Sequence, residues 1–179
     1  GLFASLIKNG VDKLCAPMTY AVWRAPIDND RHIRGKLTDA RYDCLAPRVY
    51  ETATEIVDNT LEIRATWSLA GVSRQPALRG ETIWTVYADG AIAVKMAVNK
   101  TYYAPFLPRF GITLPLPKTE AVRYCGRGPT ENYVDKCNAT WFGVFESTVR
   151  AMHEDYVRPQ ENGNHTECEW VTVGGLRAE

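Results

Sequence analysis

Polar and apolar residues alternate with a period of two over much of the chain. Four segments show this alternation: 49–57, 61–70, 81–88 and 91–98. Such a pattern indicates strands with two unlike faces, because successive side chains of a strand point to opposite sides of its sheet. Asp58-Asn59 separates the first two segments and Asp89-Gly90 the last two, and dipeptides of this kind favour tight turns. The pattern therefore predicts two antiparallel hairpins in the middle of the chain.

Shorter segments predict further strands. Asn9-Gly10 suits a type I′ turn and would join residues 2–8 to residues 11–15. Gly174-Gly175 is typical of a turn into one more strand near the end of the sequence. The remaining strands are expected at 109–116, 121–126, 140–145 and 167–173.

One segment has a helical period instead. Leu37, Ala40, Cys44 and Leu45 would lie on one face of a short helix. Pro47 would end it, because proline disfavours helical geometry in the residue before it. The chain is therefore expected to be all-β: a large antiparallel sandwich with one short helix, forming a single domain over residues 1–179.

Charge and hydropathy exclude some partners. The chain has 21 basic and 21 acidic side chains, and its arginines form no stripe, so neither nucleic acid nor an anionic membrane is expected as a partner. No apolar run approaches the ~20 residues that cross a bilayer. The five cysteines form no CxxC pair, which favours reduced thiols and a cytoplasmic protein. Because Gly1 opens the sequence, a piece of a longer protein is expected.

Metal sites are not supported by the spacing of possible ligands. Asp28, Asp30 and His32 alternate like the start of a calcium loop, but Ile33 stands where that loop needs glycine. A zinc site would have to draw on His153, His165, Cys137 and Cys168, whose spacing matches no known ligand pattern. No metal ligand is therefore predicted in this chain.

Acid–base catalysis within the chain is not expected either. If they belong to a strand, Glu167 and Glu169 would lie on one of its faces roughly 6–7 Å apart, near the separation that glycoside hydrolases use. Their polar neighbours Thr166 and Cys168 indicate a solvated face instead, where the pKa values of two carboxyl groups would not separate. No residue is predicted to be catalytic.

Five tryptophans and nine tyrosines could stack on sugar rings. Four of the tryptophans lie inside predicted strands, where aromatic side chains more often fill a core. Pattern and composition alone would therefore indicate a β-sandwich without a defined function.

Three polar segments carry a resemblance to a known family. WRAPIDND (23–30) is followed by GRGPTENYVDK (126–136) and then by YVRPQENGNHTECEW (156–170). In this order and spacing they resemble the last domain of family-2 β-galactosidases, the large bacterial lactose-cleaving enzymes, and PRFGITLPLP (108–117) fits as well. The resemblance covers essentially the whole chain.

The resemblance implies a fold and a place for the chemistry. It implies an antiparallel super-sandwich similar to galactose mutarotases, truncated at its C-terminus here. It places a retaining pair of glutamates, with magnesium and sodium nearby, in a (β/α)₈ barrel that this sequence does not contain. In the family a mobile loop beside the active site follows the DND corner, and here it would begin near Arg31. This sequence departs from the family there, with Ile27 before the corner and DRHIRG after it.

The resemblance also implies residues that support the active site. Arg24 would supply a planar set of donors, and the corner after it would supply acceptors and a turn. The two later motifs would play the same role, so all three are expected to lie close together. The supporting residues expected in this way are Arg24, Asp28, Asn29, Asp30, Glu131, Asn132, Tyr133, Glu161 and Asn162.

Three functions follow as hypotheses. The leading one is the C-terminal domain of a retaining β-galactosidase that hydrolyses terminal β-D-galactosides, inactive alone and partnered by the barrel of the same polypeptide. Its exposed sheet edge would allow self-association. The alternative is a carbohydrate-binding module that uses an exposed tryptophan such as Trp23 or Trp170. The third is a mutarotase-like epimerase, for which His153 and His165 are the candidates.

Overall fold

The computed structural model describes residues 1–101, 103 and 105–179. The chain divides into two compact units, which are described separately. The first unit contains Gly1, residues 21–24 and residues 32–111, and the second contains residues 2–20, 25–31 and 112–179. The single domain expected over residues 1–179 stays a prediction.

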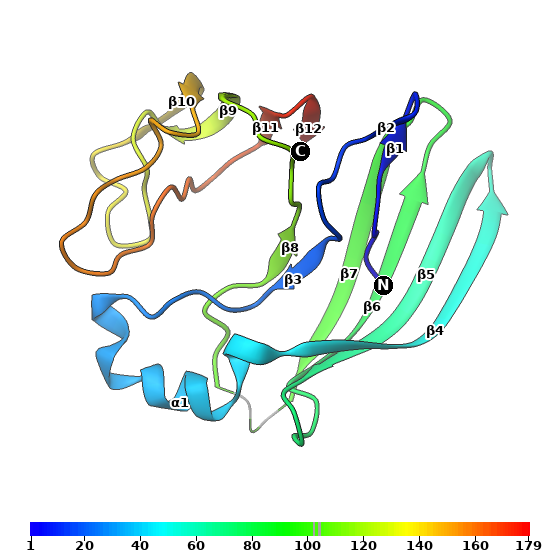
Figure 1. Cartoon of the computed structure of the whole chain (residues 1–179), viewed down its shortest axis with the longest axis horizontal. Coiled ribbons are helices and arrows are strands. Elements are labelled where there is room, and N and C mark those ends of the chain that lie inside the picture. The colour runs from blue at the N-terminus through cyan, green and yellow to red at the C-terminus, as the bar shows by residue number, and fades with distance from the viewer. Residues whose placement is uncertain (102, 104) are drawn as a thin grey trace. The chain divides into compact units, whose positions relative to one another are not determined.

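A four-stranded antiparallel sheet forms most of the first unit (Figure 1). Its strands, in sheet order, are β4 (Ala46–Val57), β5 (Thr60–Ala70), β6 (Leu78–Val86) and β7 (Ile92–Lys100). Asp58 and Asn59 both adopt positive φ angles, 48° and 62°, as a type I′ turn requires. Both predicted central hairpins are confirmed, and their strands pair in the expected antiparallel register.

The two faces of this sheet differ as the alternation predicts. On the apolar face Trp67 is buried, stacks on Phe110 with ring centroids 6.5 Å apart, and donates from Nε1 to Thr82 Oγ1 at 2.7 Å. Gly80 lies opposite Trp67, and the indole ring fills the space that a side chain there would need. On the opposite face Arg64 forms an ion pair with Glu62 at 2.9 Å. The core of this unit therefore lies on one side of its sheet.

The helical segment is shorter than the sequence predicts. Helix α1 runs over Arg34–Asp39 and is followed by a 3-10 turn, η2 (Tyr42–Cys44). The expected continuation of the helix to Pro47 is wrong, because Arg41 adopts a left-handed conformation with φ 58° and Pro47 already belongs to β4. Of the predicted apolar face, Leu37 is buried in the helix, whereas Cys44 and Leu45 lie beyond its end.

The second unit also contains a four-stranded antiparallel sheet, ordered β10-β9-β11-β12 (Figure 1). Its strands are β9 (Ala121–Gly128), β10 (Trp141–Thr148), β11 (Trp170–Val173) and β12 (Leu176–Ala178). Gly174 and Gly175 adopt positive φ angles and connect β11 to β12, which confirms the predicted turn into a further strand. Strand β12 is an edge of this sheet.

Short elements complete the chain. β1 (Ile7–Lys8) pairs with β2 (Val11–Asp12) across Asn9-Gly10, whose φ angles of 53° and 75° confirm the predicted turn. β3 (Thr19–Ala21) pairs with β8 (Gly111–Thr113), and η1 (Asp28–His32) is a 3-10 helix. The strand expected at 109–116 is therefore shorter than predicted.

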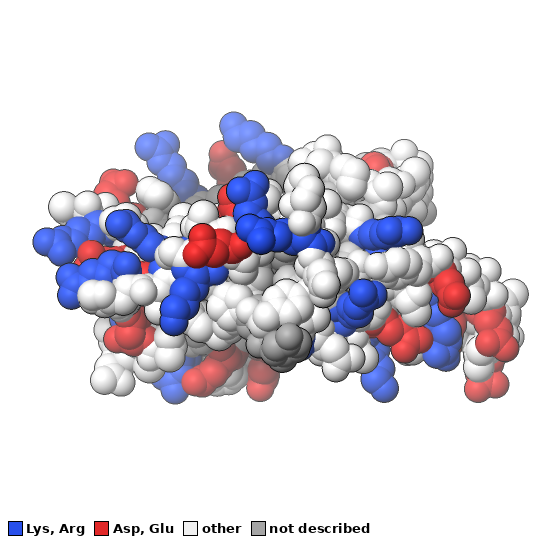
Figure 2. Space-filling view, turned by 90° about the horizontal axis from the view of Figure 1, so that it is seen from below, with Lys and Arg blue, Asp and Glu red and all other residues white. Residues whose placement is uncertain are grey.

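The fold class is all-β with several antiparallel sheets and one short helix, which matches the expected sandwich class. No helix among the described residues is long and apolar enough to span a bilayer. All five cysteines are free thiols. Basic and acidic side chains are interspersed on the face that Figure 2 displays, as the balanced charge suggests.

Candidate functional site

Residues 25–30 of the first polar motif meet the other two motifs within the second unit. Asn29 donates from Nδ2 to Asp135 Oδ2 at 3.0 Å, which joins the first motif to the second. The Asp28 amide donates to the Pro159 carbonyl at 3.0 Å, and the Asp28 carboxylate lies 3.5 Å from Arg158, which joins the first motif to the third. We call residues 27–30, 126–136 and 154–168 the motif cluster.

The first segment of the motif cluster is a closed corner. The Ile27 amide donates to Asp30 Oδ2 at 3.0 Å, while the Asp30 amide donates back to the Ile27 carbonyl at 2.9 Å. Both residues are buried. The carboxylate thus accepts from an amide three residues before it. The corner holds its shape through this reciprocal pair.

Asn132 is the centre of the cluster's hydrogen bonds. Its side chain is fully buried, and its Nδ2 donates to the Arg127 carbonyl at 2.9 Å. Its Oδ1 accepts from the Thr166 amide at 2.9 Å and from the Thr166 hydroxyl at 2.6 Å. Its amide and carbonyl bond to Asn164 at 2.7 and 2.9 Å. One amide side chain therefore connects the second motif to the third.

Glu131 is a buried charge with internal partners. Its side chain is only 3% exposed, and its Oε1 accepts hydrogen bonds from Lys136 Nζ and from the Tyr156 hydroxyl. Lys136 also donates to the Tyr156 oxygen at 2.8 Å and to the Glu161 carbonyl at 2.9 Å. Glu131 Oε2 is buried without a hydrogen-bond partner among the described residues. Removing either partner would leave a poorly compensated buried charge, which is costly.

The same contacts raise the pKa values of Lys136 and Tyr156. Burial lowers the pKa of Lys136, but its hydrogen bonds to Glu131 and Tyr156 outweigh that effect and raise the pKa above its ordinary 10.5. The hydrogen bond to Glu131 raises the pKa of Tyr156 above 10.0. Lys136 is therefore charged and Tyr156 is neutral at physiological pH. The Glu131 carboxylate thus accepts from one ammonium group and one hydroxyl group.

The third motif is tied to β9 by Arg127 and His165. Arg127 Nε lies 2.8 Å from Glu167 Oε1, and His165 Nδ1 lies 2.9 Å from the Arg127 carbonyl. Glu167 has a positive φ angle of 53° and precedes β11. Neither Glu167 nor Glu169 lies on a strand, because β11 begins at Trp170. The two glutamates therefore do not share a strand face. Glu167 is instead engaged by a guanidinium group.

The other expected supporting residues vary in their surroundings. Arg24 is half-buried and belongs to the first unit. Tyr133 is half-buried, and its carbonyl accepts from the Lys136 amide at 2.9 Å. Asn162 is exposed, and its Oδ1 accepts from the Glu154 amide at 3.2 Å. Glu161 contributes its carbonyl to Lys136.

Sequence reasoning missed the residues that complete these contacts. Lys136 closes the second motif, and Tyr156, Asn164 and Thr166 lie in the third. All four residues lie inside the motifs that carry the family resemblance, and this position was the one feature of the sequence that pointed to them. Their partners could not be assigned without a structure.

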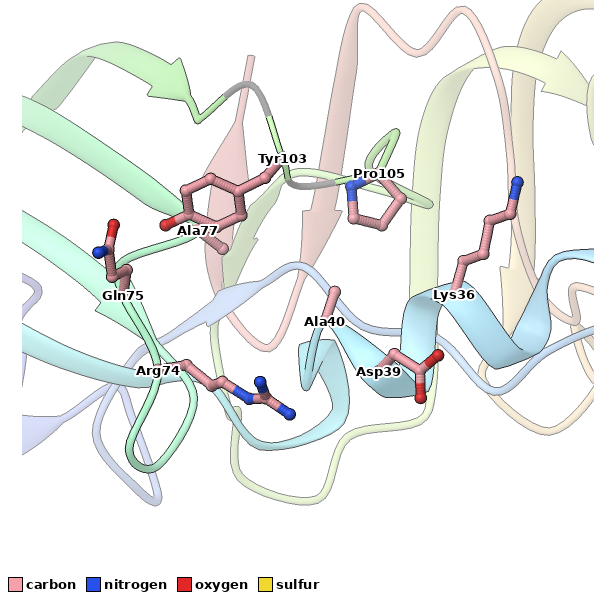
Figure 3. A pocket seen from close by; sticks show the side chains of 8 residues that line it. All are labelled: Lys36, Asp39, Ala40, Arg74, Gln75, Ala77, Tyr103 and Pro105. Carbon is pink, nitrogen blue, oxygen red and sulfur yellow. The ribbon is translucent and has the colours of Figure 1, made fainter.

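The first unit contains a separate pocket of about 830 Å³ (Figure 3). Its lining residues are Lys36, Asp39, Ala40, Arg74, Gln75, Ala77, Tyr103 and Pro105. Asp39 is the one carboxylate among them. Across the described residues, no group of three or more His, Cys, Asp or Glu side chains could hold a metal ion.

The fold and the motif cluster define an antiparallel β domain whose buried polar side chains bind one another. The family described as beta galactosidase small chain matches residues 1–177, and the chain belongs to this family. The sequence resemblance to β-galactosidases is thereby confirmed.

Several β-galactosidases are similar to the chain. It is 36% identical over 177 residues to the β-galactosidase of Actinobacillus pleuropneumoniae, with 98% of the chain and 18% of that protein covered. It is 35% identical over 172 residues to that of Staphylococcus xylosus, with 94% and 17% covered. For Lactobacillus delbrueckii subsp. bulgaricus the identity is 31% over 166 residues, with 88% and 16% covered. The chain thus spans less than a fifth of the length of these relatives.

Proposed function

We propose that this chain is a non-catalytic domain of a retaining β-galactosidase, in which it supports an active site formed by a barrel of the same polypeptide. The complete enzyme would hydrolyse terminal β-D-galactosides. Family membership and the names of the relatives support the activity. The small share of each relative that the chain covers supports a role as one part of a larger enzyme.

The observation that carries the supporting role is the buried Glu131 within the motif cluster. A catalytic carboxylate must reach the substrate, but the Glu131 side chain is 3% exposed and is engaged by Lys136 and Tyr156. Retaining hydrolysis needs two carboxyl groups about 5–5.5 Å apart on either side of the glycosidic bond. An ion-paired buried glutamate is suited to holding loops in place.

The cluster has two exposed apolar tips that could contact a neighbouring domain. Val134 is 78% exposed beside Asp135, and Val157 is 102% exposed beside Tyr156. The loop of each tip is held by the hydrogen bonds of Lys136, Asp28 and Asn29. An apolar side chain held on a fixed loop loses little conformational freedom on binding. We propose these tips as contact points for the barrel.

The resemblance implies magnesium and sodium for the complete enzyme. Among the described residues, no group of three or more His, Cys, Asp or Glu side chains could hold a metal ion, and Lys136 already forms an ion pair with Glu131. The ions would belong to the rest of the polypeptide. No step of the proposed support depends on them.

Incubation of the 179-residue chain with a chromogenic β-galactoside tests the absence of autonomous catalysis. We expect no turnover above the uncatalysed rate. Glu131→Gln and Glu167→Gln variants are the informative controls, because turnover that either change abolishes would overturn the proposal.

A carbohydrate-binding role is the second candidate, and one observation favours it. Trp141 is 59% exposed on the edge strand β10 and packs edge-on against Phe145. Trp170, by contrast, is half-buried with the guanidinium groups of Arg123 and Arg177 over its ring. Calorimetric titration with lactose separates the two functions. Binding that Trp141→Ala abolishes would favour the binding module, and no detectable heat would favour support.

The epimerase hypothesis receives no comparable support. His153 forms an exposed ion pair with Asp155 at 3.2 Å, and His165 is bonded to a backbone carbonyl. Neither histidine forms a hydrogen bond or ion pair with a glutamate among the described residues. Polarimetry of a fresh galactose solution would detect any acceleration of anomer exchange.

A further inference from the structure

Hydrogen bonds join the segments that surround the pocket of the first unit. Its borders are residues of α1 and its end, residues of the loop between β5 and β6, and Tyr103 and Pro105 (Figure 3). The Tyr42 hydroxyl donates to the Pro105 carbonyl at 2.8 Å, and the Tyr103 hydroxyl donates to the Pro76 carbonyl at 2.7 Å. The Thr101 amide and hydroxyl both donate to the Ala77 carbonyl. Three segments distant in sequence are therefore held around one space.

Three of the residues that line the pocket are charged. Lys36 and Arg74 are cationic and Asp39 is anionic, which leaves one excess positive charge. Elsewhere in this unit Arg64 forms an ion pair with Glu62 at 2.9 Å. Within the part of the chain that the structure describes, no ion pair engages the three pocket residues. Their hydrogen-bonding capacity therefore remains for a ligand.

The uncharged lining supplies a complementary surface. Tyr103 presents an aromatic ring whose hydroxyl is fixed by Pro76, while Ala40, Ala77 and Pro105 add apolar atoms. Gln75 carries an amide that can both donate and accept. A small number of polar groups around an apolar and aromatic surface is the usual lining of a small-molecule site, and about 830 Å³ lies in the usual size range.

We propose that this pocket binds a small polyhydroxylated anion, a sugar acid or a sugar phosphate. Lys36 and Arg74 would bind the carboxylate or phosphate, because the guanidinium group is a planar donor suited to either anion. Asp39 and Gln75 would bind hydroxyl groups of the ligand, and its sugar ring would lie against the aromatic ring of Tyr103. This site is independent of the supporting role proposed for the motif cluster.

The lining excludes a glycosidase centre in the same place. Asp39 is the one carboxylate of the eight lining residues, whereas both stereochemical courses of glycoside hydrolysis use two. The pocket therefore binds without hydrolysing. Its charged side chains are exposed, so solvent and salt screen them and the affinity is expected to be modest.

Calorimetric titration of the 179-residue chain tests this site. The probes are galacturonate, galactose 6-phosphate, neutral galactose and inorganic phosphate, at low and at high salt. We expect both sugar anions to bind in the millimolar range, more tightly than galactose or phosphate alone, and to bind more weakly at high salt. The two sugar anions distinguish a carboxylate ligand from a phosphate ligand. Equal binding of galactose and the sugar anions, or no binding of either anion, would overturn the proposal.

Variants locate the binding. Arg74→Gln and Lys36→Gln should each weaken binding of the preferred anion about tenfold or more, the loss expected for one charge-assisted hydrogen bond. Lys95→Gln is the matched control, because Lys95 is exposed on β7 and does not line the pocket. Circular dichroism verifies the fold of each variant. Equal weakening by all three changes would indicate nonspecific attraction and contradict the site.

Discussion

The sheet of the first unit and the motif cluster of the second are held together by different forces. In the sheet, Trp67 is buried by Phe110 and by the strands on either side of it, and neighbouring strands are joined by short turns. In the motif cluster, Asn132 and Glu131 are buried, and each has a partner in the third motif, 34 and 25 residues away in sequence, beside partners only five residues away. One region is stabilised mainly by apolar burial and the other by polar contacts.

This difference predicts different responses to mutation. Apolar burial is roughly proportional to area and does not depend strongly on direction. A buried polar contact depends on geometry, and removing one partner leaves the other unsatisfied. The sheet should therefore tolerate polar changes on its outer face, whereas the motif cluster should be sensitive to single-atom changes.

The largest effect is expected for Trp67→Ala. It removes a fully buried ring and its hydrogen bond to Thr82, and should lower the free energy of unfolding by about 3–5 kcal/mol. Urea unfolding followed by circular dichroism measures the change. Thr66→Ala, on the outer face of the same strand, should stay within about 0.5 kcal/mol. Similar losses for both variants would refute the apolar core assigned to this sheet.

A smaller but more local effect is expected for Asn132→Ala. The change removes the hydrogen bond to the Arg127 carbonyl, which keeps His165 as a partner, and leaves the Thr166 amide without the partner it has in the wild type. It should cost about 1–3 kcal/mol. Hydrogen exchange should accelerate in residues 126–136 and 156–166 and remain unchanged in β5 and β6. The exposed Asn162→Ala is the control. Uniform acceleration over both units would show that the motif cluster is not a separately stabilised region.

The Glu131 contacts should respond to alkaline pH. The fold raises the pKa of Lys136 and of Tyr156, so the folded state binds these protons more tightly than the unfolded state. Their stabilising contribution is therefore complete below about pH 10 and is lost as the pH rises through the folded pKa values. Thermal melting between pH 8 and 12 should show a steeper decline for the wild type than for Lys136→Met. Lys118→Met, which changes an exposed lysine of the same unit, should decline like the wild type.

The smallest effect concerns the turn of the first hairpin. Asn59 has a φ angle of 62°, which glycine adopts without steric cost. Asn59→Gly should therefore raise the free energy of unfolding by less than about 1 kcal/mol. A matched Thr60→Gly change, at the first residue of β5, should lower it. Destabilisation by Asn59→Gly would contradict the assigned turn.

The hairpins could be predicted from sequence because their signals are local. Alternation over a few residues and an intervening Asp-Asn or Asp-Gly specify both strands and the turn between them. The early end of α1 could not be predicted, because it depends on Arg41 adopting a left-handed conformation and packing closely over Gly71, thirty residues away. Residues separated this far are brought together only by the fold.

For the candidate site, the sequence predicted which segments lie together but not which side chains pair. The motifs that resemble β-galactosidases predicted that residues 28–30 and the segments around Glu131 and Glu161 would lie together, and they do so in the second unit. The pairing of Glu131 with Lys136 and Tyr156 depends on how two loops face each other. Nothing in the alternation or spacing of residues determines that geometry. The supporting roles themselves stay predictions.

The most direct test is the activity of the complete polypeptide carrying Glu131→Gln, compared with Asn132→Ala. Activity should be measured per correctly folded molecule, with hydrogen exchange in residues 126–136 measured on the same samples. If the motif cluster acts as a support, both variants should lose activity in proportion to the loosening of that segment, and cooling should restore it. If Glu131→Gln abolished turnover while the segment stayed as protected as in the wild type, Glu131 would take part in the chemistry and the account would be wrong.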